Sequence, residues 1–309
     1  MWAGSLDVTK ITPVNTSVMA NIPTMIKFGA DVVKTEPRKF ADYFQTSEKP
    51  KGFVTLIFGD TASGKTFTSM SFPEPLYIID TENRASSTKY YNYRHKQINI
   101  FEPVQFKTQF TETDIDSFDT YKTIEEINHF IIDFANEVKS GRISKGTLVV
   151  DSTTDIWSFV QDWSITELSK KLNSKGEKRA DPLLMKMQNQ FDWGVPNKKH
   201  AEMLGILRSL IKYGIYIVFT AREREAPPDY AQQLKVITMK EKIRAQKDVP
   251  FLSDVIINLK KTATTTGTKY MGQIAKFNGL PIPDPVENVT YDTLVRLMDE
   301  QEKKLQVKT

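Results

Sequence analysis

Cysteine is absent from this sequence of 309 residues, and histidine occurs only three times. Without thiols the chain has no disulfide, no thiolate zinc site and no cysteine nucleophile. The three histidines, His95, His129 and His200, do not have the spacing of a metal-ligand motif. Any bound metal is therefore expected to have oxygen ligands.

Long hydrophobic runs are also missing. No stretch of about 18 apolar residues is present, so we expect no membrane-spanning segment and no membrane partner. The first residues, "MWAGSLDVTKITPVNTS", lack the basic and apolar regions of a secretion signal, which predicts a cytoplasmic protein, in the host cytoplasm if its source is viral. The net charge of +4 is too small to indicate a polyanionic partner by itself.

What the sequence does contain is a series of short apolar runs, typical of strands buried on both faces of a parallel sheet. They are "FVTLIF", "LYIID", "QINIF", "TLVVD" and "IYIVFT". Helical patterns lie between several of them, as in "TIEEINHFIIDFANEVKS" and "HAEMLGILRSLIKYG". This alternation predicts an α/β fold with a mostly parallel, doubly wound sheet.

Towards the carboxyl end the pattern changes. "DVIINLKK" and "KYMGQIAKFNG", separated by a Thr/Gly-rich turn, predict an antiparallel hairpin, and a helix is expected from about Thr290. We therefore divide the chain into an N-terminal arm (1–50), a core (51–285) and a C-terminal helix (286–309).

The strongest motif is "GDTASGKT", which fits the phosphate-loop pattern G-x-x-x-x-G-K-[ST] between a predicted strand and a predicted helix. Backbone N–H groups of such a loop surround phosphates, the lysine reaches the β- and γ-phosphate oxygens, and the hydroxyl ligates Mg²⁺. We expect a nucleotide and Mg²⁺ here, with Lys65 also acting in catalysis. The predicted nucleotide-binding residues are Gly59, Asp60, Thr61, Ala62, Ser63, Gly64, Lys65, Thr66 and Phe67.

Two carboxylates follow predicted strands. Asp151 ends "TLVVD", where α/β folds bind ligands, and is the candidate metal residue together with Thr66; the alternative is that it caps the next helix. Asp80 and Glu82 follow "LYII", and Glu82 is a candidate base or water-orienting group; the alternative is an exposed loop acid.

The order of these segments, from "GDTASGKT" through "IDTEN", "VVDS" and "VFTARERE" to "IAKFNG", resembles the RecA/RadA-like P-loop ATPase core over about residues 50 to 285. It is most similar to the RecA-core ATPases of phages and viruses, some of which promote single-strand annealing. The resemblance implies that Glu82 is the catalytic acid and Asp151 the carboxylate associated with Mg²⁺. It places Thr220 and Arg222 at the γ-phosphate sensor, where the family usually has an amide.

Lys276, in "IAKFNG", resembles a basic residue that some members insert across a subunit interface towards a neighbour's γ-phosphate. The resemblance therefore implies self-association into a ring or filament, with the ATP site between protomers. The alternative is a solvated hairpin lysine.

Positive charge is concentrated in two segments that correspond to the DNA-binding loops of RecA-like recombinases. Residues 169–200 carry eight Lys/Arg against three acids, and residues 222–247 carry seven against four. Such charge suits a nucleic-acid backbone, and Phe191 and Trp193 are candidates for stacking on bases. The alternative is two solvated loops. A third basic and aromatic stretch, 89–96, fits packing on adenine, contact with nucleic acid or support of the sheet.

The function predicted from these features is that of an ATP-hydrolysing, RecA-like protein that binds single-stranded DNA in recombination, annealing or replication. Three alternatives remain: a small-molecule P-loop phosphotransferase, a DNA-packaging or remodelling motor of another P-loop branch, and a nucleotide-gated assembly protein with slow or no hydrolysis.

Overall fold

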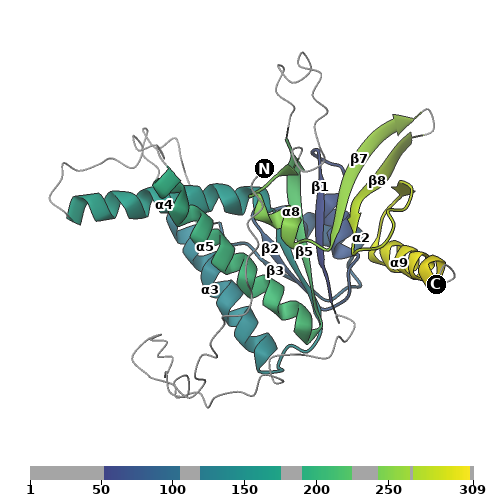
Figure 1. Cartoon of the computed structure of the whole chain (residues 1–309), viewed down its shortest axis with the longest axis horizontal. Helices are drawn as coiled ribbons and strands as arrows, with labels where there is room; N and C mark the ends of the chain where they lie inside the picture. The colour runs from purple at the N-terminus through teal and green to yellow at the C-terminus, as the bar shows by residue number, and fades with distance from the viewer. Residues whose placement is uncertain (1–51, 105–118, 175–189, 225–242, 265–266, 307–309) are drawn as a thin grey trace, which may run out of the picture. The chain divides into compact units, whose positions relative to one another are not determined.

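Figure 1 shows the computed structural model of the chain, which describes residues 52–104, 119–174, 190–224, 243–264 and 267–306. The chain divides into two units, Met1–Glu48 and Lys49–Thr309, and every described residue belongs to the second. The predicted N-terminal arm lies outside the described residues.

The described part of the chain forms one nine-stranded sheet, in the order β3-β2-β4-β5-β1-β7-β8-β9, with β6 paired to β5. Strands β3, β2, β4, β5, β1 and β7 are parallel, whereas β8, β9 and β6 pair in the antiparallel sense. This confirms the predicted α/β class, with a mostly parallel sheet and a C-terminal antiparallel hairpin. The strands are β1 (Val54–Gly59), β2 (Leu76–Asp80), β3 (Ile98–Phe101), β4 (Gly146–Asp151), β5 (Ile215–Glu223), β6 (Ile243–Arg244), β7 (Val255–Thr264), β8 (Gly267–Phe277) and β9 (Val286–Glu287).

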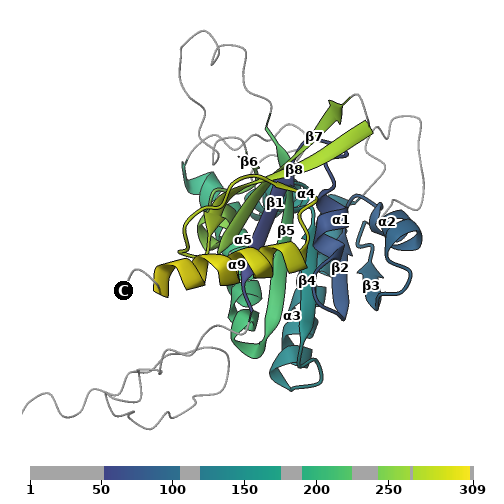
Figure 2. The same ribbon diagram turned by 90° about the vertical axis from the view of Figure 1, so that its right-hand side faces the viewer.

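The central strands are buried because helices cover both faces of the sheet. Every residue of β1 and of β4 is buried, which explains why these strands read as continuous apolar runs rather than as alternating patterns. Figures 1 and 2 show α3 (Thr120–Lys139), α4 (Thr153–Ser174) and α5 (Gln190–Ser209) on one face. The other face carries α1 (Lys65–Met70), α2 (Ala85–Asn92) and α9 (Tyr291–Gln306).

Helix α3 has the amphipathic pattern expected of a helix that covers a sheet. It begins after Asp119, whose carboxylate accepts a hydrogen bond from the backbone N–H of Lys122 at 3.0 Å. Its apolar stripe is buried against the sheet and against α4 and α5, as the sequence predicts: Ile124, Ile127, Ile131, Phe134 and Val138.

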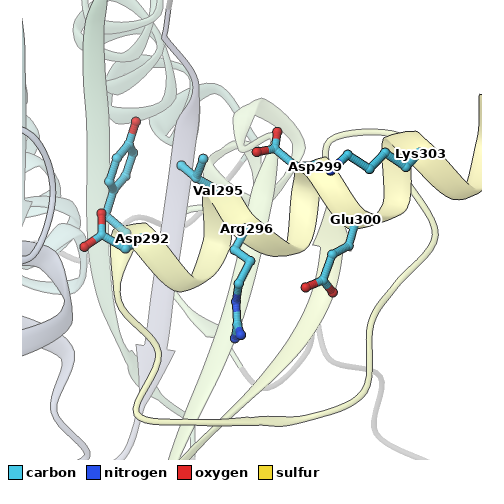
Figure 3. A pocket seen from close by; sticks show the side chains of 7 residues that line it. Asp292, Val295, Arg296, Asp299, Glu300 and Lys303 are labelled. Carbon is cyan, nitrogen blue, oxygen red and sulfur yellow. The ribbon is translucent and has the colours of Figure 1, made fainter.

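Helix α9 is packed against the sheet by Leu294 and Leu297, which join the buried cluster around Phe72. Its outer face carries charges of both signs and borders an open hollow of about 390 Å³ (Figure 3).

Within the described residues no helix is both long and apolar enough to cross a membrane. Short connections complete the fold: the 3-10 helix η3 (Leu210–Tyr213), which ends at Gly214, and α8 (Asp248–Leu252).

One expectation about the connections is wrong at both of its ends, while residues 175–189 between them lie outside the described residues. The sequence favours a loop over residues 169–200, but α4 continues to Ser174 and α5 already begins at Gln190. Pro196 lies inside α5, near its amino end. The proline and the high density of charge obscure the helical pattern in the sequence. In the folded protein, contacts with α3 stabilise both α4 and α5.

His200 on α5 is a buried, uncharged residue of this helical layer. Its ring lies edge-on to the Trp157 ring, with 5.3 Å between centroids, and the side chains around it are mostly apolar. Burial lowers the pKa of His200 to about 4, although the charge of Asp248 opposes the shift. The folded protein therefore binds no proton at His200 at pH values where an unfolded chain does.

We expect this histidine to make the protein acid-sensitive. As the pH falls from about 6.5 to about 4, the unfolded state gains a proton that the folded state does not, which lowers the free energy of unfolding by on the order of 3 kcal/mol. The variant His200→Leu should lack this component. Urea unfolding of both proteins across this pH range measures the difference; a constant gap between the two curves would contradict the assignment.

Candidate nucleotide site

The candidate site lies where the carboxyl ends of the parallel strands β1, β2, β4 and β5 meet, beside the middle of β7. Gly59 at the end of β1 pairs with Arg222 on β5 and with Leu259 on β7. Asp80 at the end of β2 pairs with Asp151 at the end of β4. This alignment brings residues far apart in the sequence to one edge of the sheet, the edge at which parallel α/β sheets bind ligands.

The phosphate-loop segment, 59–66, takes a conformation that glycine makes accessible. Gly64 has φ 94° and precedes α1, and Ala62 also has a positive φ, of 59°. At Gly59 the limit is space, because an added Cβ atom would lie 2.2 Å from the carbonyl oxygen of Leu259. Close packing of the loop on β7 therefore requires glycine at position 59.

Lys65 and Ser63 provide polar groups at this loop. The Lys65 Nζ donates to the carbonyl oxygens of Gly59 and Asp60, at 3.1 and 2.8 Å, which holds the ammonium against the loop. Burial lowers the pKa of Lys65, and the charges of nearby acids, Glu82 first among them, oppose this shift. The Ser63 hydroxyl is buried and has no hydrogen-bond partner within the described residues, as expected of a group that meets a ligand.

Asp151 is almost completely buried, and two hydroxyls donate to its carboxylate. The Thr66 hydroxyl lies 2.7 Å from Oδ2, and the Thr220 hydroxyl donates to Oδ1. Burial raises the pKa of Asp151 to about 6, whereas these two hydrogen bonds lower it. Thr66 and Asp151, the predicted metal residues, thus lie in direct contact.

This pair fits Mg²⁺ chemistry, because Mg²⁺ in nucleotide sites is held by one or two protein oxygens together with phosphate oxygens. Within the described residues no group of three or more His, Asp or Glu side chains has the arrangement of a metal site. Thr66 and Asp151 would therefore hold the ion only together with a phosphate ligand.

The turn after β2 is shaped by Asp80 and presents Glu82. The buried Asp80 carboxylate accepts from the backbone N–H groups of Glu82 and Ala85, at 3.1 and 2.8 Å. Burial raises the pKa of Asp80, and these backbone hydrogen bonds lower it. Asp80 is thus a structural residue, and Glu82 is the acid that this turn places at the site.

Arg222 is paired with Glu82. Its Nε and Nη2 atoms donate to Glu82 Oε1 at 3.2 and 3.1 Å, and Nη2 also donates to Asp155 at 3.0 Å. The Glu82 side chain is 18% exposed and that of Arg222 is 44% exposed. The structure therefore brings Glu82, Arg222, Asp151 and Thr220 together beside Lys65.

Lys276 is not part of this group within the subunit. It pairs with Ile256 near the start of β7, whereas Leu259 pairs with Gly59 at the phosphate loop. Lys276 therefore lies roughly 10 Å along β7 from that edge. Its Nζ donates to the backbone carbonyls of Phe251 and Ser253. The expected contact with a neighbouring subunit's nucleotide stays a prediction.

The stretch 89–96 supports the phosphate-loop helix on one side. Tyr93 is buried and donates to the carbonyl oxygen of Phe67 at 3.0 Å. Lys96 donates to the carbonyl oxygens of Met70, Ser71 and Phe72, between 2.9 and 3.0 Å, where α1 ends. Tyr90 and Tyr91 instead face the solvent. The structural interpretation of this stretch thus applies to Tyr93 and Lys96.

The two basic segments are described only in part. Lys170 pairs with Glu167, Lys198 with Glu202, and Lys199 with Glu125. Lys199 also lies over the Trp163 ring, 4.7 Å from its centroid, so part of the charge of 169–200 is used within the fold. Trp193 is 39% exposed on α5. The side chain of Phe191 and residues 225–242 lie outside the described parts.

Sequence reasoning missed two residues. Tyr270 on β8 borders the phosphate loop, since a Cβ atom added at Gly64 would lie 3.6 Å from its ring; nothing local in the sequence marks it. Asp155 contacts Arg222 from the first turn of α4. An acid in the otherwise uncharged start of that helix, four residues after Asp151, was the available signal.

The packing of Gly59 gives a direct test of the loop geometry. We expect Gly59→Ala to lower the free energy of unfolding by about 1–3 kcal/mol, because the new methyl group meets the Leu259 carbonyl. Gly205→Ala is the matched control: it adds the same methyl group on α5, where nothing lies within 4 Å, and should gain about 0.5–1 kcal/mol. Urea midpoints measure both; equal effects of the two changes would refute the close approach.

The part of the chain that contains the phosphate-loop segment also matches a known protein family. The AAA domain family AAA_24 matches residues 51–281, and the search of curated proteins finds no match. Among solved structures, a KaiC-like protein from the hyperthermophilic archaeon Pyrococcus horikoshii OT3 is similar, with 14% sequence identity and a TM-score of 0.40, over 76% of this chain and 85% of that chain. Because the family match spans well over half of the sequence, the protein belongs to this AAA domain family of P-loop ATPases.

Proposed function

We propose that this protein is an Mg²⁺-dependent ATPase that binds single-stranded DNA through residues 169–200 and 222–247 and acts in recombination, annealing or replication. The proposal includes the relation to phage and viral annealing ATPases that the sequence indicates. One observation carries it. Arg222, the first residue of a basic segment, is ion-paired with Glu82, the acid beside the phosphate loop.

In the proposed reaction each polar residue has a separate task. The N–H groups at the start of α1 and the Lys65 ammonium bind the phosphates. Mg²⁺, when bound beside Thr66 and Asp151, neutralises phosphate charge. Glu82 orients a water molecule and accepts its proton as the water attacks the γ-phosphorus. The bond from the γ-phosphorus to the β–γ bridging oxygen breaks, and ADP is the leaving group.

The position of Arg222 links this chemistry to the polymer. A γ-phosphate offers the guanidinium an anionic partner that competes with Glu82. Loss of the γ-phosphate on hydrolysis therefore changes the contacts of Arg222, the first residue of segment 222–247. In the proposed cycle ATP favours the DNA-bound form, and hydrolysis favours release.

The charge distribution supports a polyanionic partner. The two basic segments have net charges of +5 and +3, against +4 for the whole chain, so the remainder of the protein is acidic. Contacts of lysine and arginine with nucleic-acid phosphates release counterions, and binding then weakens with salt. Self-association into a ring or filament, with Lys276 reaching the neighbouring site, belongs to the same proposal and rests on the resemblance.

Steady-state ATP hydrolysis tests the function. We expect hydrolysis to rise several-fold with single-stranded DNA, to rise less with duplex DNA, and to lose the stimulation between 50 and 200 mM salt, where phosphate contacts weaken steeply. The variant Lys65→Ala, which lacks the phosphate-binding ammonium, serves as the blank.

The other outcomes separate the alternatives. A preference for duplex DNA would favour a packaging or remodelling motor. Hydrolysis that depends on Lys65 but responds to no polymer would refute DNA binding and favour a small-molecule phosphotransferase. Nucleotide binding without hydrolysis in every condition would favour a nucleotide-gated assembly protein.

A further inference from the structure

Asp155 on the first turn of α4 connects three segments of the candidate site. Its carboxylate accepts hydrogen bonds from the Arg222 Nη2 at 3.0 Å, the Ser152 hydroxyl at 2.9 Å and the Thr81 hydroxyl at 3.2 Å. Thr81 follows β2, Ser152 follows β4, and Arg222 lies near the end of β5. One side chain thus holds together the ends of three neighbouring strands.

The Arg222 guanidinium is shared between two acids. Its Nε and Nη2 atoms bind Glu82, and Nη2 also binds Asp155, so one positive charge bridges two carboxylates. The two acids are about equally exposed, 17% for Asp155 and 18% for Glu82, but the Asp155 carboxylate also accepts hydrogen bonds from Ser152 and Thr81, which restrict its movement. Asp155 is therefore the more fixed of the two anchors of Arg222.

The charges in this cluster also favour Asp155 as an anchor of Arg222. Burial raises the pKa of Asp155, while the Ser152 hydrogen bond and the Arg222 charge oppose that shift. The positive charge of Arg222 thus favours the ionised form of the Asp155 carboxylate, which is the form that binds the guanidinium most strongly. Removing either partner leaves the other poorly compensated in a partly buried place.

We propose that Asp155 is a positioning residue for ATP hydrolysis, which anchors Arg222 beside Glu82 and the γ-phosphate without touching the nucleotide. This inference rests on the proposed function. When Glu82 turns towards the attacking water, Arg222 loses one of its two anchors. The contact with Asp155 keeps the guanidinium in place for the transition state, where charge on the phosphoryl oxygens is greatest.

A purely structural role predicts something different. An acid in the first turn of a helix interacts favourably with the helix dipole, and Asp155 also fixes the turn at Ser152. If that were its whole contribution, its loss would lower the thermal stability and leave the turnover of the folded protein unchanged. The two roles differ in turnover number, nucleotide affinity and coupling to Arg222.

The test uses Asp155→Asn, which keeps the shape and the acceptor oxygen but removes the charge. We expect kcat to fall roughly tenfold to a hundredfold, as for other misplaced catalytic groups. The affinity for a fluorescent ATP analogue should stay within about twofold, because Asp155 does not contact nucleotide. Asp162→Asn, which changes an exposed acid further along α4, is the matched control and should leave kcat unchanged.

A double-mutant cycle with Arg222→Gln measures how the two losses of activity are coupled. A loss of stability alone would not produce this coupling. If Asp155 acts through Arg222, then Asp155→Asn should cost little further activity in the Arg222→Gln background. Full additivity of the two losses, or a normal kcat in Asp155→Asn, would overturn the proposal. Should Asp155→Asn not fold, Arg222→Lys replaces it: a single ammonium cannot reproduce the fork that binds both acids, so a normal kcat there would also overturn it.

The same assays separate this inference from the function on which it rests. Wild-type protein without hydrolysis that depends on Lys65 refutes the ATPase proposal, and the role of Asp155 falls with it. Wild-type hydrolysis that depends on Lys65, together with a normal kcat in Asp155→Asn, refutes only the positioning role.

Discussion

The arrangement of the site depends on one buried carboxylate at the end of β4. Asp151 accepts hydrogen bonds from Thr66, on the helix after the phosphate loop, and from Thr220 on β5. Its own backbone carbonyl accepts from the N–H of Thr81 at 2.7 Å, which ties the end of β2 to β4. A buried acid is costly unless such partners satisfy it, so these contacts constrain the ends of all these segments together.

Much of this architecture follows from the sequence because it depends on local patterns. The five apolar runs became β1 to β5. The inner strands β1, β2, β4 and β5 are covered on both faces and have no polar side, whereas the edge strand β3 exposes Asn99. The phosphate loop is recognisable because its conformation and close packing depend on particular residue types, such as glycine at positions 59 and 64. The predicted neighbours of this loop, Asp151 and Glu82, needed only the rule that parallel strands end at one edge.

What the sequence did not predict depends on register and side-chain pairing. The pairing of β7 with β8 is irregular between Ile256 and Ile257, so the distance of Lys276 from the phosphate loop was not readable from its motif. The partners of Arg222 come from residues 82 and 155, and no local pattern connects them. The lengths of α4 and α5 depend on their packing against α3.

Lys96 shows how a single side chain restrains the helix that follows the phosphate loop. Helix α1 has only six residues, and the Lys96 ammonium binds three carbonyls where that helix ends. Lys96 itself belongs to the short connection between α2 and the strand β3. A tilt of α1 would therefore have to displace this connection as well. The short helix behind the phosphate loop is thereby anchored, at its carboxyl end, to the connection that leads into the edge strand β3.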